Sequence, residues 1–369
     1  MKILYIIDSL SSGGAEKLVR DTVPLINQNK DVKVVVLLLT DENNVYENHL
    51  REQGIEIKII TLRKIRSPLN IFYILKYIKE NNYDVVHVHL FPANYWTSIA
   101  SKLIINNKPK FILTEHSTHN KRREKWYFRY IEKFVYSSFD KVISISPSTQ
   151  YNLLKWLRFK NEKKRKFSII GNGIDLNCFS QATPYKKYWI DNGLRETDKL
   201  IGMVGRFSDQ KDQATVIKAL INLPKDIKLL LIGEGKLKKE IEKLAVNLGV
   251  AKRVYFLGFR NDVNRILKTA DIIVLSSFWE GFGLAAVEGM AAGKPVVASD
   301  VPGLSEVVQG AGCLFSQGNY NELSSIVEEL FNNNTLYEKV KKNCLKRSVE
   351  YNINSMVKDY LKEYKDLLQ

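Results

Sequence analysis

Apolar and polar positions along the chain follow two patterns that alternate almost from end to end. Short continuous runs of apolar, often β-branched residues are separated by longer segments in which apolar residues recur with a helical period. Such runs, spaced by helices, are typical of parallel strands buried on both faces of a sheet. They predict strands at 2–7, 32–39, 55–60, 84–90, 110–114, 140–145 and 167–171, and at 199–205, 227–232, 253–257, 271–275, 295–299 and 312–315.

These strands are more than a single twisted open sheet usually holds, so the pattern predicts two Rossmann-like, doubly wound α/β domains. The alternation lapses within 172–195, in the stretch GIDLNCFSQATPYKKY. We therefore expect a first domain over 1–180 and a second over 181–351. Ligands of such sheets bind at the carboxyl ends of the strands, so we expect the two domains to face each other across a ligand-binding cleft.

Composition narrows the class of protein. With 45% hydrophobic and 26% charged residues among 369, the chain is expected to fold and not to be disordered. Asp8 interrupts the first apolar run too early for a signal peptide, and no window approaches the roughly 18 apolar residues of a membrane-spanning helix. Three distant cysteines fit a reducing cytoplasm and suggest neither a disulfide framework nor a metal cluster.

The net charge of +16 is concentrated in the first half. Residues 1–180 hold 29 Lys and Arg against 17 Asp and Glu, a surplus of +12, and the rest of the chain holds a surplus of +4. Dense cationic segments lie at 61–68, 121–136 and 161–167. Such a field favours an anionic partner, which would be a nucleic acid, a membrane surface or a phosphorylated substrate. The alternative is a generally basic surface without a specific partner.

The segment SSFWEGFGLAAVEGMAAGKPVVASD, 276–300, carries the most informative chemistry. A buried strand leads into a turn with Gly281 and Gly283, and a short helix follows. Glycines let backbone N–H groups approach a ligand, and a helix N-terminus favours an anion such as phosphate. Glu280 lies in the turn. Glu288 lies within the helix among apolar neighbours, so it is expected to have a hydrogen-bonding partner, either ligand hydroxyl groups or a basic side chain.

This segment resembles the E-x7-E signature of family GT4 retaining glycosyltransferases. The string EGFGLAAVEGMAAGKPVVASDVPGLSEVV matches that family's run closely, except that Gly289 stands where alanine is usual. A glycine there would loosen the helix by up to about 1 kcal/mol. The resemblance covers nearly the whole chain. It implies the GT-B fold, with the C-terminal segment 352–369 returning to complete the first domain.

Three further segments of the second half resemble the same family. GMVGRFSDQKD, 202–212, places Arg206 and Lys211 at the family's G-R-x4-K positions. The resemblance gives these two cations the task of stabilising the departing nucleoside diphosphate without a metal ion. By the same resemblance, LLLIGEGKLKKEIE borders the nucleotide at Gly233, and VYFLGFRND holds the base through backbone groups around Gly258 and Phe259.

In the first half, DSLSSGGAEKLVR resembles the family's first strand-to-helix loop. The resemblance implies that Gly13 and Gly14 bring this loop close to the donor phosphates and the acceptor. His116 ends a strand in ILTEHSTH, where family members often place a histidine near the outer hydroxyl groups of the donor sugar. His87 and His89 share one side of their strand and are expected to be packed or near the acceptor, with no third metal ligand in evidence.

The resemblance assigns roles to the two glutamates and their neighbours. Glu288 is expected to hold the ribose hydroxyl groups and Glu280 the hydroxyl groups of the transferred sugar. Phe282, Gly283 and Leu284 are expected to contact sugar and diphosphate through their backbone. Family precedent is retention of anomeric configuration, with the leaving phosphate helping to deprotonate the acceptor. The pair is therefore not interpreted as the two catalytic carboxylates of a glycoside hydrolase.

The basic segment KRREKWYFRYIEKFVY, 121–136, has two interpretations. Positions 126, 127, 130, 131, 134 and 135 form an apolar helical stripe bordered by Lys121, Arg122, Lys125, Arg129 and Lys133. The stripe could dock on anionic lipid as an interfacial helix with a positive rim. Alternatively the stripe is core and the charges are solvated, and for this helix alone the pattern favours the core interpretation.

The sequence thus predicts a retaining glycosyltransferase that moves one hexosyl or N-acetylhexosaminyl unit from a nucleotide sugar, UDP-linked, to a growing lipid-linked glycan. We expect it to work without a metal or cofactor, in the cytoplasm, peripherally on the anionic inner face of the plasma membrane. Nucleic acid is not expected as a partner. The alternatives are a GT-B-fold sugar-nucleotide epimerase and a non-enzymatic nucleic-acid-binding α/β protein. The second leaves Arg206, Lys211, Glu280 and Glu288 unexplained.

Overall fold

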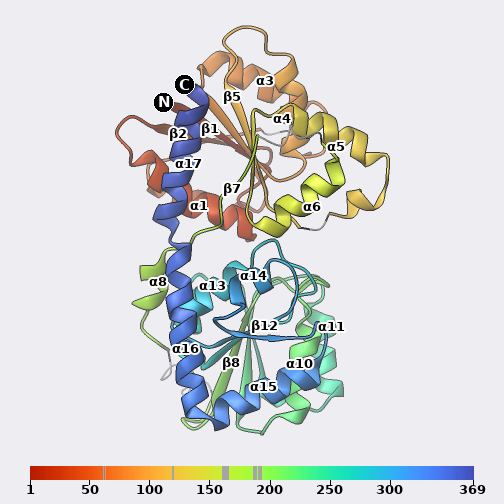
Figure 1. The fold of residues 1–369 in the computed structure, drawn as a ribbon, viewed down its shortest axis with the longest axis vertical. Helices are drawn as coiled ribbons and strands as arrows, with labels where there is room; N and C mark the ends of the chain where they lie inside the picture. The colour runs from red at the N-terminus through yellow and green to blue at the C-terminus, as the bar shows by residue number, and fades with distance from the viewer. Residues whose placement is uncertain (61, 63, 119, 160–165, 186–188, 190–192) are drawn as a thin grey trace. The chain divides into compact units, whose positions relative to one another are not determined.

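The computed structural model describes every residue of the chain except 61, 63, 119, 160–165, 186–188 and 190–192 (Figure 1). Most of the cationic segment 161–167 therefore lies outside the described residues. The described chain forms two compact units. The first comprises Met1–Gly173 with Ile353–Gln369, and the second comprises Ile174–Asn352.

The first unit is a seven-stranded parallel sheet in the order β3-β2-β1-β4-β5-β6-β7. Its strands are β1 (Lys2–Ile7), β2 (Lys33–Leu38), β3 (Glu56–Ile59), β4 (Val85–His89), β5 (Lys110–Glu115), β6 (Lys141–Ser144) and β7 (Phe167–Ile169). Its helices are α1 (Gly14–Asn27), α2 (Glu47–Glu52), α3 (Asn70–Asn81), α4 (Ala93–Lys102), η1 (Lys121–Glu124), α5 (Phe128–Ser137), α6 (Pro147–Leu157) and α17 (Ile353–Leu368).

Successive strand residues of this sheet point into two separate apolar layers, as the period of a strand requires. Tyr5 and its alternate neighbours pack with α1 and α17, whereas Leu4 and Ile6 pack on the other face with α3, α4, α5 and α6. Both faces are thus buried, which is why the strands are continuous apolar runs in the sequence. Figure 1 shows α17, at the C-terminus, running along the side of the first unit that also carries α1.

The second unit is a six-stranded parallel sheet in the order β10-β9-β8-β11-β12-β13. Its strands are β8 (Lys199–Val204), β9 (Ile227–Ile232), β10 (Val254–Gly258), β11 (Ile272–Leu275), β12 (Val296–Ser299) and β13 (Cys313–Phe315). Its helices are α8 (Leu176–Ser180), α10 (Gln213–Asn222), α11 (Lys238–Asn247), η2 (Ala251–Arg253), α12 (Val263–Thr269), α13 (Leu284–Ala291), α14 (Leu304–Val308), α15 (Tyr320–Asn332), α16 (Asn334–Ser348) and η3 (Val349–Tyr351).

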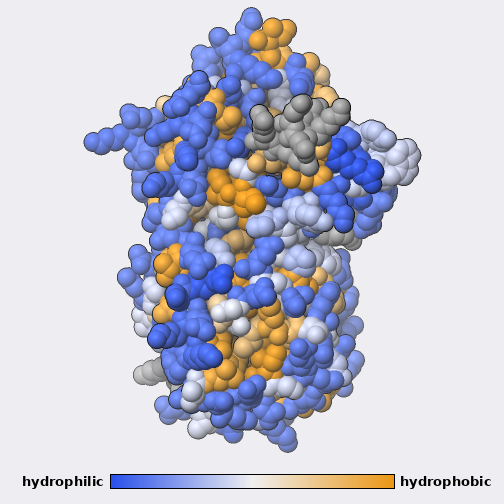
Figure 2. All heavy atoms as spheres, viewed as in Figure 1, coloured by the Kyte–Doolittle hydropathy of each residue, from blue (hydrophilic) through white to orange (hydrophobic). Residues whose placement is uncertain are grey.

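Every strand predicted from the sequence is present, and each sheet is doubly wound. The strand order reverses between β1 and β4 in the first sheet and between β8 and β11 in the second. Loops diverge at such a reversal, and this is where open α/β sheets bind ligands. On the face shown in Figure 2, hydrophilic side chains predominate on both units and hydrophobic ones show in separate patches.

The boundary between the units differs slightly from the expected one. Residues 174–180 belong to the second unit and not to the first, because α8 packs against α12 and α13. The returning segment begins at Ile353, the first residue of α17. The chain therefore passes to the second unit soon after β7, and the segment around α8 is part of that unit's packing.

The apolar stripe of 121–136 is not core, so the core interpretation is wrong for all of it except Val135. Trp126 is 71% exposed and Tyr130 66%, and Tyr127, Ile131 and Phe134 are also exposed. The helix instead buries a face that includes a carboxylate, with Glu132, Val135 and Tyr136 as its buried residues. The physical reason is that Glu132 has basic and hydroxyl partners inside the unit, described below.

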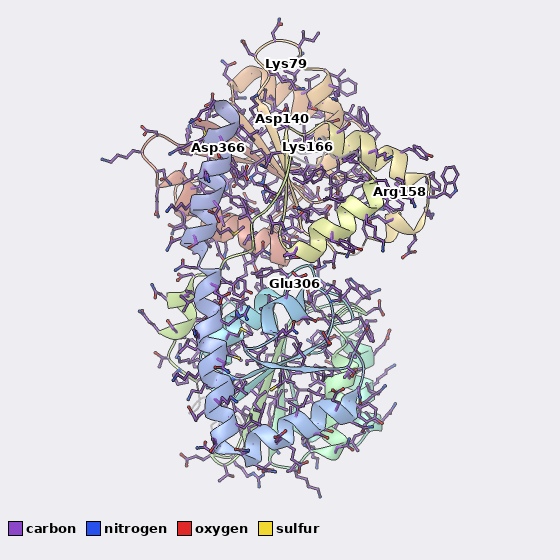
Figure 3. All side chains as sticks on the ribbon, viewed as in Figure 1. Lys79, Asp140, Arg158, Lys166, Glu306 and Asp366 are labelled. Atoms are coloured by element: carbon purple, nitrogen blue, oxygen red, sulfur yellow. The ribbon has the colours of Figure 1, made fainter. Side chains whose placement is uncertain are left out.

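The end of α5 is tied to the sheet by charged side chains that cap backbone groups. The Lys166 ammonium donates to the carbonyl oxygens of Tyr136 at 2.5 Å and Phe139 at 3.0 Å. The Asp140 carboxylate accepts a hydrogen bond of 2.7 Å from the backbone N–H of Phe111 in β5. Figure 3 labels Lys166 and Asp140 in this region. The orientation of α5, and with it the exposure of its aromatic side, is therefore anchored to the sheet.

Candidate active site

In the second unit, the candidate site residues lie on four loops that follow β8, β9, β10 and β11, around the point where the strand order reverses. Backbone hydrogen bonds join these loops: Gly205 donates to Ile232 O at 2.9 Å, Phe207 to Glu234 O at 3.0 Å and Gly233 to Gly258 O at 2.8 Å. The loops therefore form one connected rim at the carboxyl edge of the sheet.

Two glycines are required by the close approach of these loops. Gly233 has φ +139°, and a Cβ atom there would lie 2.2 Å from the carbonyl oxygen of Gly205. A Cβ atom on Gly235 would lie 2.3 Å from Phe207 O. Any side chain at either position would force the two loops apart. Gly233, which the resemblance predicts to border the nucleotide, lies at this rim, and the tight fit gives a structural reason for the glycine.

Lys211 and Glu280 form an ion pair, although they are far apart in the sequence. Lys211 follows β8, and Glu280 follows β11. The same Glu280 oxygen accepts a hydrogen bond of 2.9 Å from the hydroxyl group of Ser277. The Ser276 hydroxyl donates to Asp212 O at 2.6 Å, which ties the two loops together beside the pair. An ammonium group and a carboxylate, both mostly buried, are thus held at the rim by the strands that carry them.

Arg206 completes the cationic pair predicted from the sequence, but its environment differs from that of Lys211. Its side chain is exposed, and no hydrogen bond or ion pair engages its guanidinium group within the described part of the chain. Its backbone carbonyl accepts a hydrogen bond of 3.1 Å from the Gln213 side chain, which fixes the loop. The guanidinium is therefore available to an anionic ligand without breaking a protein contact.

The start of α13 provides backbone donors. Gly283 is the N-cap with φ +93°, and no side chain caps this helix end. Leu284 is the first helical residue, and the Ala286 N–H already donates to Gly283 O at 2.9 Å, so the N–H groups of Leu284 and Ala285 are the ones offered to a ligand. The ring of Phe282 is buried and packs edge-on against Tyr351 at a centroid distance of 5.3 Å. The side chain of Phe282 is thus used for packing, and a contact of its backbone with sugar or diphosphate stays a prediction of the resemblance.

Glu288 lies in the second turn of α13 and is only 3% exposed. Next to it, Gly289 packs directly on β11, because a Cβ atom there would lie 2.9 Å from Ile273 Cγ1. The alanine that is usual at this position would collide with Ile273 in this chain. The departure from the family pattern therefore fits the helix to its neighbouring strand.

The third loop carries Gly258 and Phe259. Gly258 has φ +67°, and a Cβ atom there would lie 2.8 Å from the Glu234 carboxylate. Glu234 in turn accepts a hydrogen bond of 3.0 Å from the Lys238 ammonium. The Phe259 ring is 41% exposed. Sequence reasoning considered only backbone contacts here, but an exposed aromatic ring next to a glycine turn also offers a stacking surface for a base.

His116, Gly13 and Gly14 belong to the first unit, at the carboxyl edge of its own sheet. His116 follows β5, and its Nε2 lies 2.9 Å from Nδ1 of His89 at the end of β4. Burial lowers the pKa of His116 to about 4, so its imidazole is neutral near pH 7. The hydrogen bond with His89 fixes the orientation of the His116 ring. The sequence alone did not predict this contact between the two histidines.

His87 and His89 are both fully buried, as packed residues would be. His87 lies 2.7 Å from the Tyr364 hydroxyl of α17 and 2.7 Å from the Thr114 hydroxyl of β5. The Tyr364 hydroxyl also lies 2.6 Å from the Tyr5 hydroxyl. This buried chain of polar groups locks the C-terminal helix onto the first sheet. In the described residues, no group of three or more His, Cys, Asp or Glu is arranged to hold a metal ion.

Asp8 is a feature of the first loop that sequence reasoning did not single out. It follows β1 and is buried, and its Oδ1 accepts a hydrogen bond of 2.9 Å from the Ala93 N–H. Burial raises the pKa of Asp8 to about 7, with a smaller contribution from Glu16. Gly13 is the N-cap of α1, and Glu16 accepts a hydrogen bond of 2.9 Å from the Ser11 hydroxyl. Two carboxyl groups thus flank the glycine loop.

Replacing Asp8 with asparagine should change how stability depends on pH. Because the folded pKa is raised, native Asp8 keeps a proton between about pH 4 and pH 7 that the unfolded chain has lost, so its contribution to stability falls as pH rises through this window. In Asp8→Asn this loss disappears. The free energy of unfolding of the variant minus that of the native chain should therefore rise by about 1.4 kcal/mol per pH unit across the window.

Urea denaturation of both proteins at several pH values between 4 and 8 measures this difference. The histidines are common to both proteins and cancel in the difference. Asp31→Asn, which changes an exposed carboxyl group, is the matched control and should follow the native curve. Parallel curves for Asp8→Asn and the native chain would contradict a raised pKa at Asp8.

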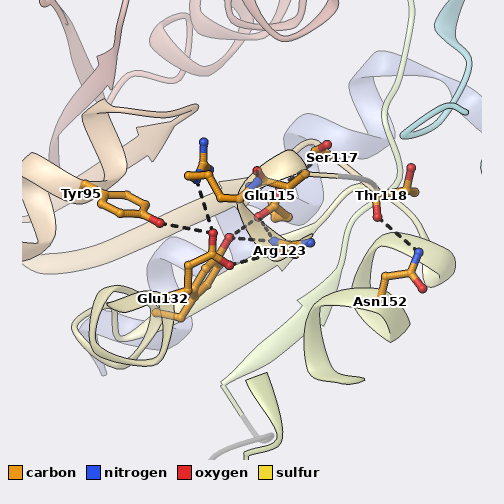
Figure 4. A network of polar contacts seen from close by, with 10 residues as sticks. Tyr95, Glu115, Ser117, Thr118, Arg123, Glu132 and Asn152 are labelled. Carbon is orange, nitrogen blue, oxygen red and sulfur yellow. Dashed lines mark hydrogen bonds and ion pairs between the residues drawn. The ribbon is translucent and has the colours of Figure 1, made fainter. Parts of the chain in front are cut away.

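A buried network of charges lies close to His116 (Figure 4). Arg123 donates to Glu132 at 3.2 Å and to Glu115, the last residue of β5, at 3.1 Å. Arg122 lies 3.6 Å from Glu132, and the Tyr95 hydroxyl donates to Glu132 at 3.2 Å. The network joins α4, η1 and α5 to the strand end that precedes His116. No local sequence signal marks it, because its members come from four separate elements.

Two family models match the chain, one for each half. The model of glycosyl transferases group 1 matches residues 186–347, and the model of glycosyltransferase family 4 matches residues 12–177. The first range falls within the second unit, and the second range covers most of the first unit and ends at residue 177, four residues into the second unit. No helix in the described residues combines the length and the apolar character needed to cross a membrane.

Known proteins match over most of their length. An uncharacterised glycosyltransferase of Methanocaldococcus jannaschii is 30% identical over 283 residues, 71% of this chain and 69% of the relative. A Campylobacter jejuni transferase, named N-acetylgalactosamine-N,N'-diacetylbacillosaminyl-diphospho-undecaprenol 4-alpha-N-acetylgalactosaminyltransferase, is 27% identical over 344 residues, 92% of this chain and 89% of the relative.

Among solved structures, Anabaena HepE in complex with UDP and glucose superposes with a TM-score of 0.87 at 22% identity, covering 99% of this chain and 100% of the other. This likeness shows the GT-B fold. Both halves of the sequence match models of the same enzyme group, and the predicted motifs lie at the carboxyl edges of the two sheets. The chain is a member of the group 1, family 4 type of glycosyltransferases.

Proposed function

We propose that the chain is a retaining glycosyltransferase that transfers one sugar, a hexosyl or N-acetylhexosaminyl unit, from a UDP-sugar to a lipid-linked glycan without a metal ion. The observation that carries this is the rim of the second sheet, where Arg206 and the Lys211–Glu280 pair lie near the open start of α13. Cations and backbone donors at one rim suit a leaving group whose charge increases during the reaction.

The resemblance assigns a task to each of these groups, and their positions support it. As the bond between the sugar's anomeric carbon and the phosphate oxygen breaks, negative charge grows on the diphosphate. Arg206, Lys211 and the N–H groups at the start of α13 stabilise that charge. The acceptor oxygen bonds to the anomeric carbon on the same face, and its proton passes to the departing phosphate. The products are UDP and a lengthened glycan, and no side-chain base takes part.

The remaining residues hold the substrates. Glu288 accepts hydrogen bonds from the ribose hydroxyl groups, and Glu280 binds hydroxyl groups of the transferred sugar while it positions Lys211. Gly258 and Phe259 border the base. In the first unit, neutral His116 offers a hydrogen bond to the outer hydroxyl groups of the donor sugar, with His89 orienting its ring. Gly13 and Gly14 leave room beside the loop after β1.

The acceptor and the location rest on two kinds of support. The Campylobacter jejuni relative and an Escherichia coli relative are named as enzymes acting on diphospho-undecaprenol and diphosphoundecaprenol acceptors. In this chain, the first half holds most of the positive charge, and α5 exposes aromatic side chains beside cations. We therefore place the enzyme peripherally on the anionic cytoplasmic face of the membrane.

Nucleotide binding is the first test. In a thermal shift assay with EDTA, UDP and UDP-sugars should stabilise the protein more than GDP, ADP or their sugar conjugates do. A ligand at 100 times its dissociation constant adds about 2.7 kcal/mol to the free energy of unfolding. The response should be lost in Glu288→Ala and strongly reduced in Glu288→Gln, which keeps the buried volume. Glu240→Gln, an exposed change in the same unit, should respond like the native chain.

The outcomes separate the alternatives. Stabilisation by UDP in EDTA supports a UDP-sugar donor and a metal-independent site. Stabilisation by GDP or ADP instead would reject the donor proposed here but keep the transferase. A response that requires a divalent cation would overturn the metal-independent mechanism.

A further inference from the structure

A second cationic site lies in the first unit, away from the rim of the second sheet. A pocket of about 340 Å³ is lined by Thr118, by residues of the segment 120–124 and by residues of α5 and α6 with the C-cap of α6. We call it the α5–α6 pocket. Its lining is mainly basic and amide side chains, with Arg123 and Arg129 on one side and Asn152, Lys155 and Arg158 on the other. The sequence pattern placed Arg129 in the positive rim of a candidate interfacial helix, and it assigned no ligand to Arg123, Asn152, Lys155 or Arg158.

Buried donors in this pocket have no hydrogen-bond partner among the described residues. They are Nη1 of Arg123, Nε of Arg129 and the indole Nε1 of Trp156. The Arg123 side chain is only 10% exposed, and its other nitrogens are engaged by Glu115 and Glu132. Figure 4 shows its guanidinium group reaching from these carboxylates toward Thr118 and Asn152. A buried N–H without a partner is unfavourable, so such donors indicate a ligand with oxygen acceptors.

The charge of the pocket specifies the ligand further. Arg123 is compensated by Glu115 and Glu132, but Arg129, Lys155 and Arg158 face only the carboxylate of Glu124 among the residues that line the pocket. The surplus is positive. Several donors of fixed planar geometry around a small cavity match a group with several charged oxygens, which a phosphate or diphosphate provides and a neutral sugar does not.

The surroundings of the pocket indicate how that phosphate is carried. Arg129 lies on α5, whose exposed side carries Tyr130 and Phe134, and the exposed Trp126 and Tyr127 directly precede this helix. Trp126 and Tyr130 contact each other edge-on, with their ring centroids 6.2 Å apart. Exposed tryptophan and tyrosine beside cations are typical of surfaces that meet the headgroup level of a bilayer. A phosphate that belongs to a lipid satisfies both the buried donors and the exposed rings.

We propose that the α5–α6 pocket binds the phosphate or diphosphate group of a lipid, with the aromatic side of α5 resting on the membrane around it. This deepens the proposed function, on which its identification with the acceptor rests, by naming where the anionic part of a lipid-linked acceptor binds. Arg123 joins this pocket to the strand end before His116, because the same guanidinium contacts Glu115. The Arg123 side chain thus both lines the proposed acceptor pocket and contacts the last residue of β5.

Isothermal titration of the full-length protein with pyrophosphate, at saturating UDP, tests the pocket. UDP occupies the donor site, so the remaining pyrophosphate binding reports on other sites. The double variant Lys155→Ala/Arg158→Ala should bind pyrophosphate at least about tenfold more weakly than the native chain. Both side chains are exposed, and Arg158 lies at the outer end of α6 (Figure 3), so the fold should be unaffected.

The matched control is Lys79→Ala/Lys102→Ala, which removes the same charge from exposed positions on α3 and α4. It should bind pyrophosphate as the native chain does. Equal weakening in the two double variants would show general charge attraction and overturn the pocket. Absence of pyrophosphate binding in UDP-saturated native protein would also overturn it. If UDP itself fails to bind, the proposed donor assignment is rejected, but the pocket is not. Pyrophosphate is then titrated into the Arg206→Ala variant, in which the donor site is weakened, and this titration still tests the pocket.

Three probes identify the source of the phosphate. Geranyl diphosphate binding more tightly than pyrophosphate, with the same loss in Lys155→Ala/Arg158→Ala, supports a lipid-linked diphosphate. Flotation with phosphatidylglycerol vesicles that depends on these two residues supports a phospholipid headgroup. Flotation should also fall about tenfold in Trp126→Ser/Tyr130→Ser but not in Val246→Ser, an exposed apolar position of the second unit. Equal affinity for free and lipid-borne diphosphate, without flotation, would overturn the lipid part of the proposal.

Discussion

Arg206→Ala should lower kcat by about 10²–10³-fold while leaving the thermal midpoint nearly unchanged. The large kinetic effect is expected because this guanidinium is proposed to stabilise charge that appears on the diphosphate only as the sugar bond breaks. The small stability effect follows from its position. The side chain is exposed and makes no hydrogen bond or ion pair among the described residues. Release of UDP from the UDP-sugar that stabilises the protein most, with water as the acceptor, measures kcat.

Two variants make this result interpretable. Lys239→Ala removes an exposed cation from α11 of the same unit and should keep both kcat and stability. Lys211→Met should lower kcat and also stability, by about 3 kcal/mol, because it leaves the mostly buried Glu280 carboxylate without its cation. Native-like turnover in Arg206→Ala would show that this residue does not act on the leaving group.

Glu132→Ala should reduce the free energy of unfolding of the chain by about 3–5 kcal/mol. The carboxylate is fully buried and is surrounded by Arg122, Arg123 and Tyr95. Its removal takes the neighbouring carboxylate from Arg122 and leaves Arg123 with Glu115 as its remaining carboxylate, and such a loss is far larger than that of an exposed ion pair. Urea denaturation followed by circular dichroism gives the difference in free energy.

The matched control is Glu80→Ala on α3, the same chemical change at an exposed carboxylate 3.9 Å from Lys76. Its effect should stay below about 1 kcal/mol. The double variant Arg123→Met/Glu132→Ala should lose less than the sum of its single variants, since the two groups interact directly. A loss of less than about 1 kcal/mol in Glu132→Ala would contradict the role of this network in holding α5.

The network also explains why α5 exposes its apolar side. A helix normally turns its apolar stripe inward, which is why the sequence pattern of 121–136 favoured a core helix. Here the Glu132 carboxylate contacts Arg122, Arg123 and Tyr95 inside the unit. The Lys166 ammonium also donates a hydrogen bond to the carbonyl oxygen of Tyr136 near the end of the helix. Long-range charge pairing overrides the periodic pattern. The exposed rings are then available for a membrane, as proposed above.

The sequence by itself determined the two parallel sheets, because strands buried on both faces must be continuous apolar runs. It also located the ligand-binding loops. Motifs with glycines and charged residues directly after such runs must lie at the carboxyl edge of the sheet, as Lys211 and Glu280 do. Roles for these residues came from the resemblance, since a glutamate in a turn has no chemistry of its own until its neighbours are known.

Only the tertiary structure decided which of these groups meet. The Lys211–Glu280 pair, the His89–His116 contact and the Glu115–Arg123–Glu132 network all join residues from different elements. Parallel strands bring the ends of distant segments together, and no local pattern records which side chain faces which. The buried donors of the α5–α6 pocket likewise come from different elements, so no local pattern records that they lie together. Burial is a property of the folded chain, and it converts ordinary surface residue types into a site that requires an anion.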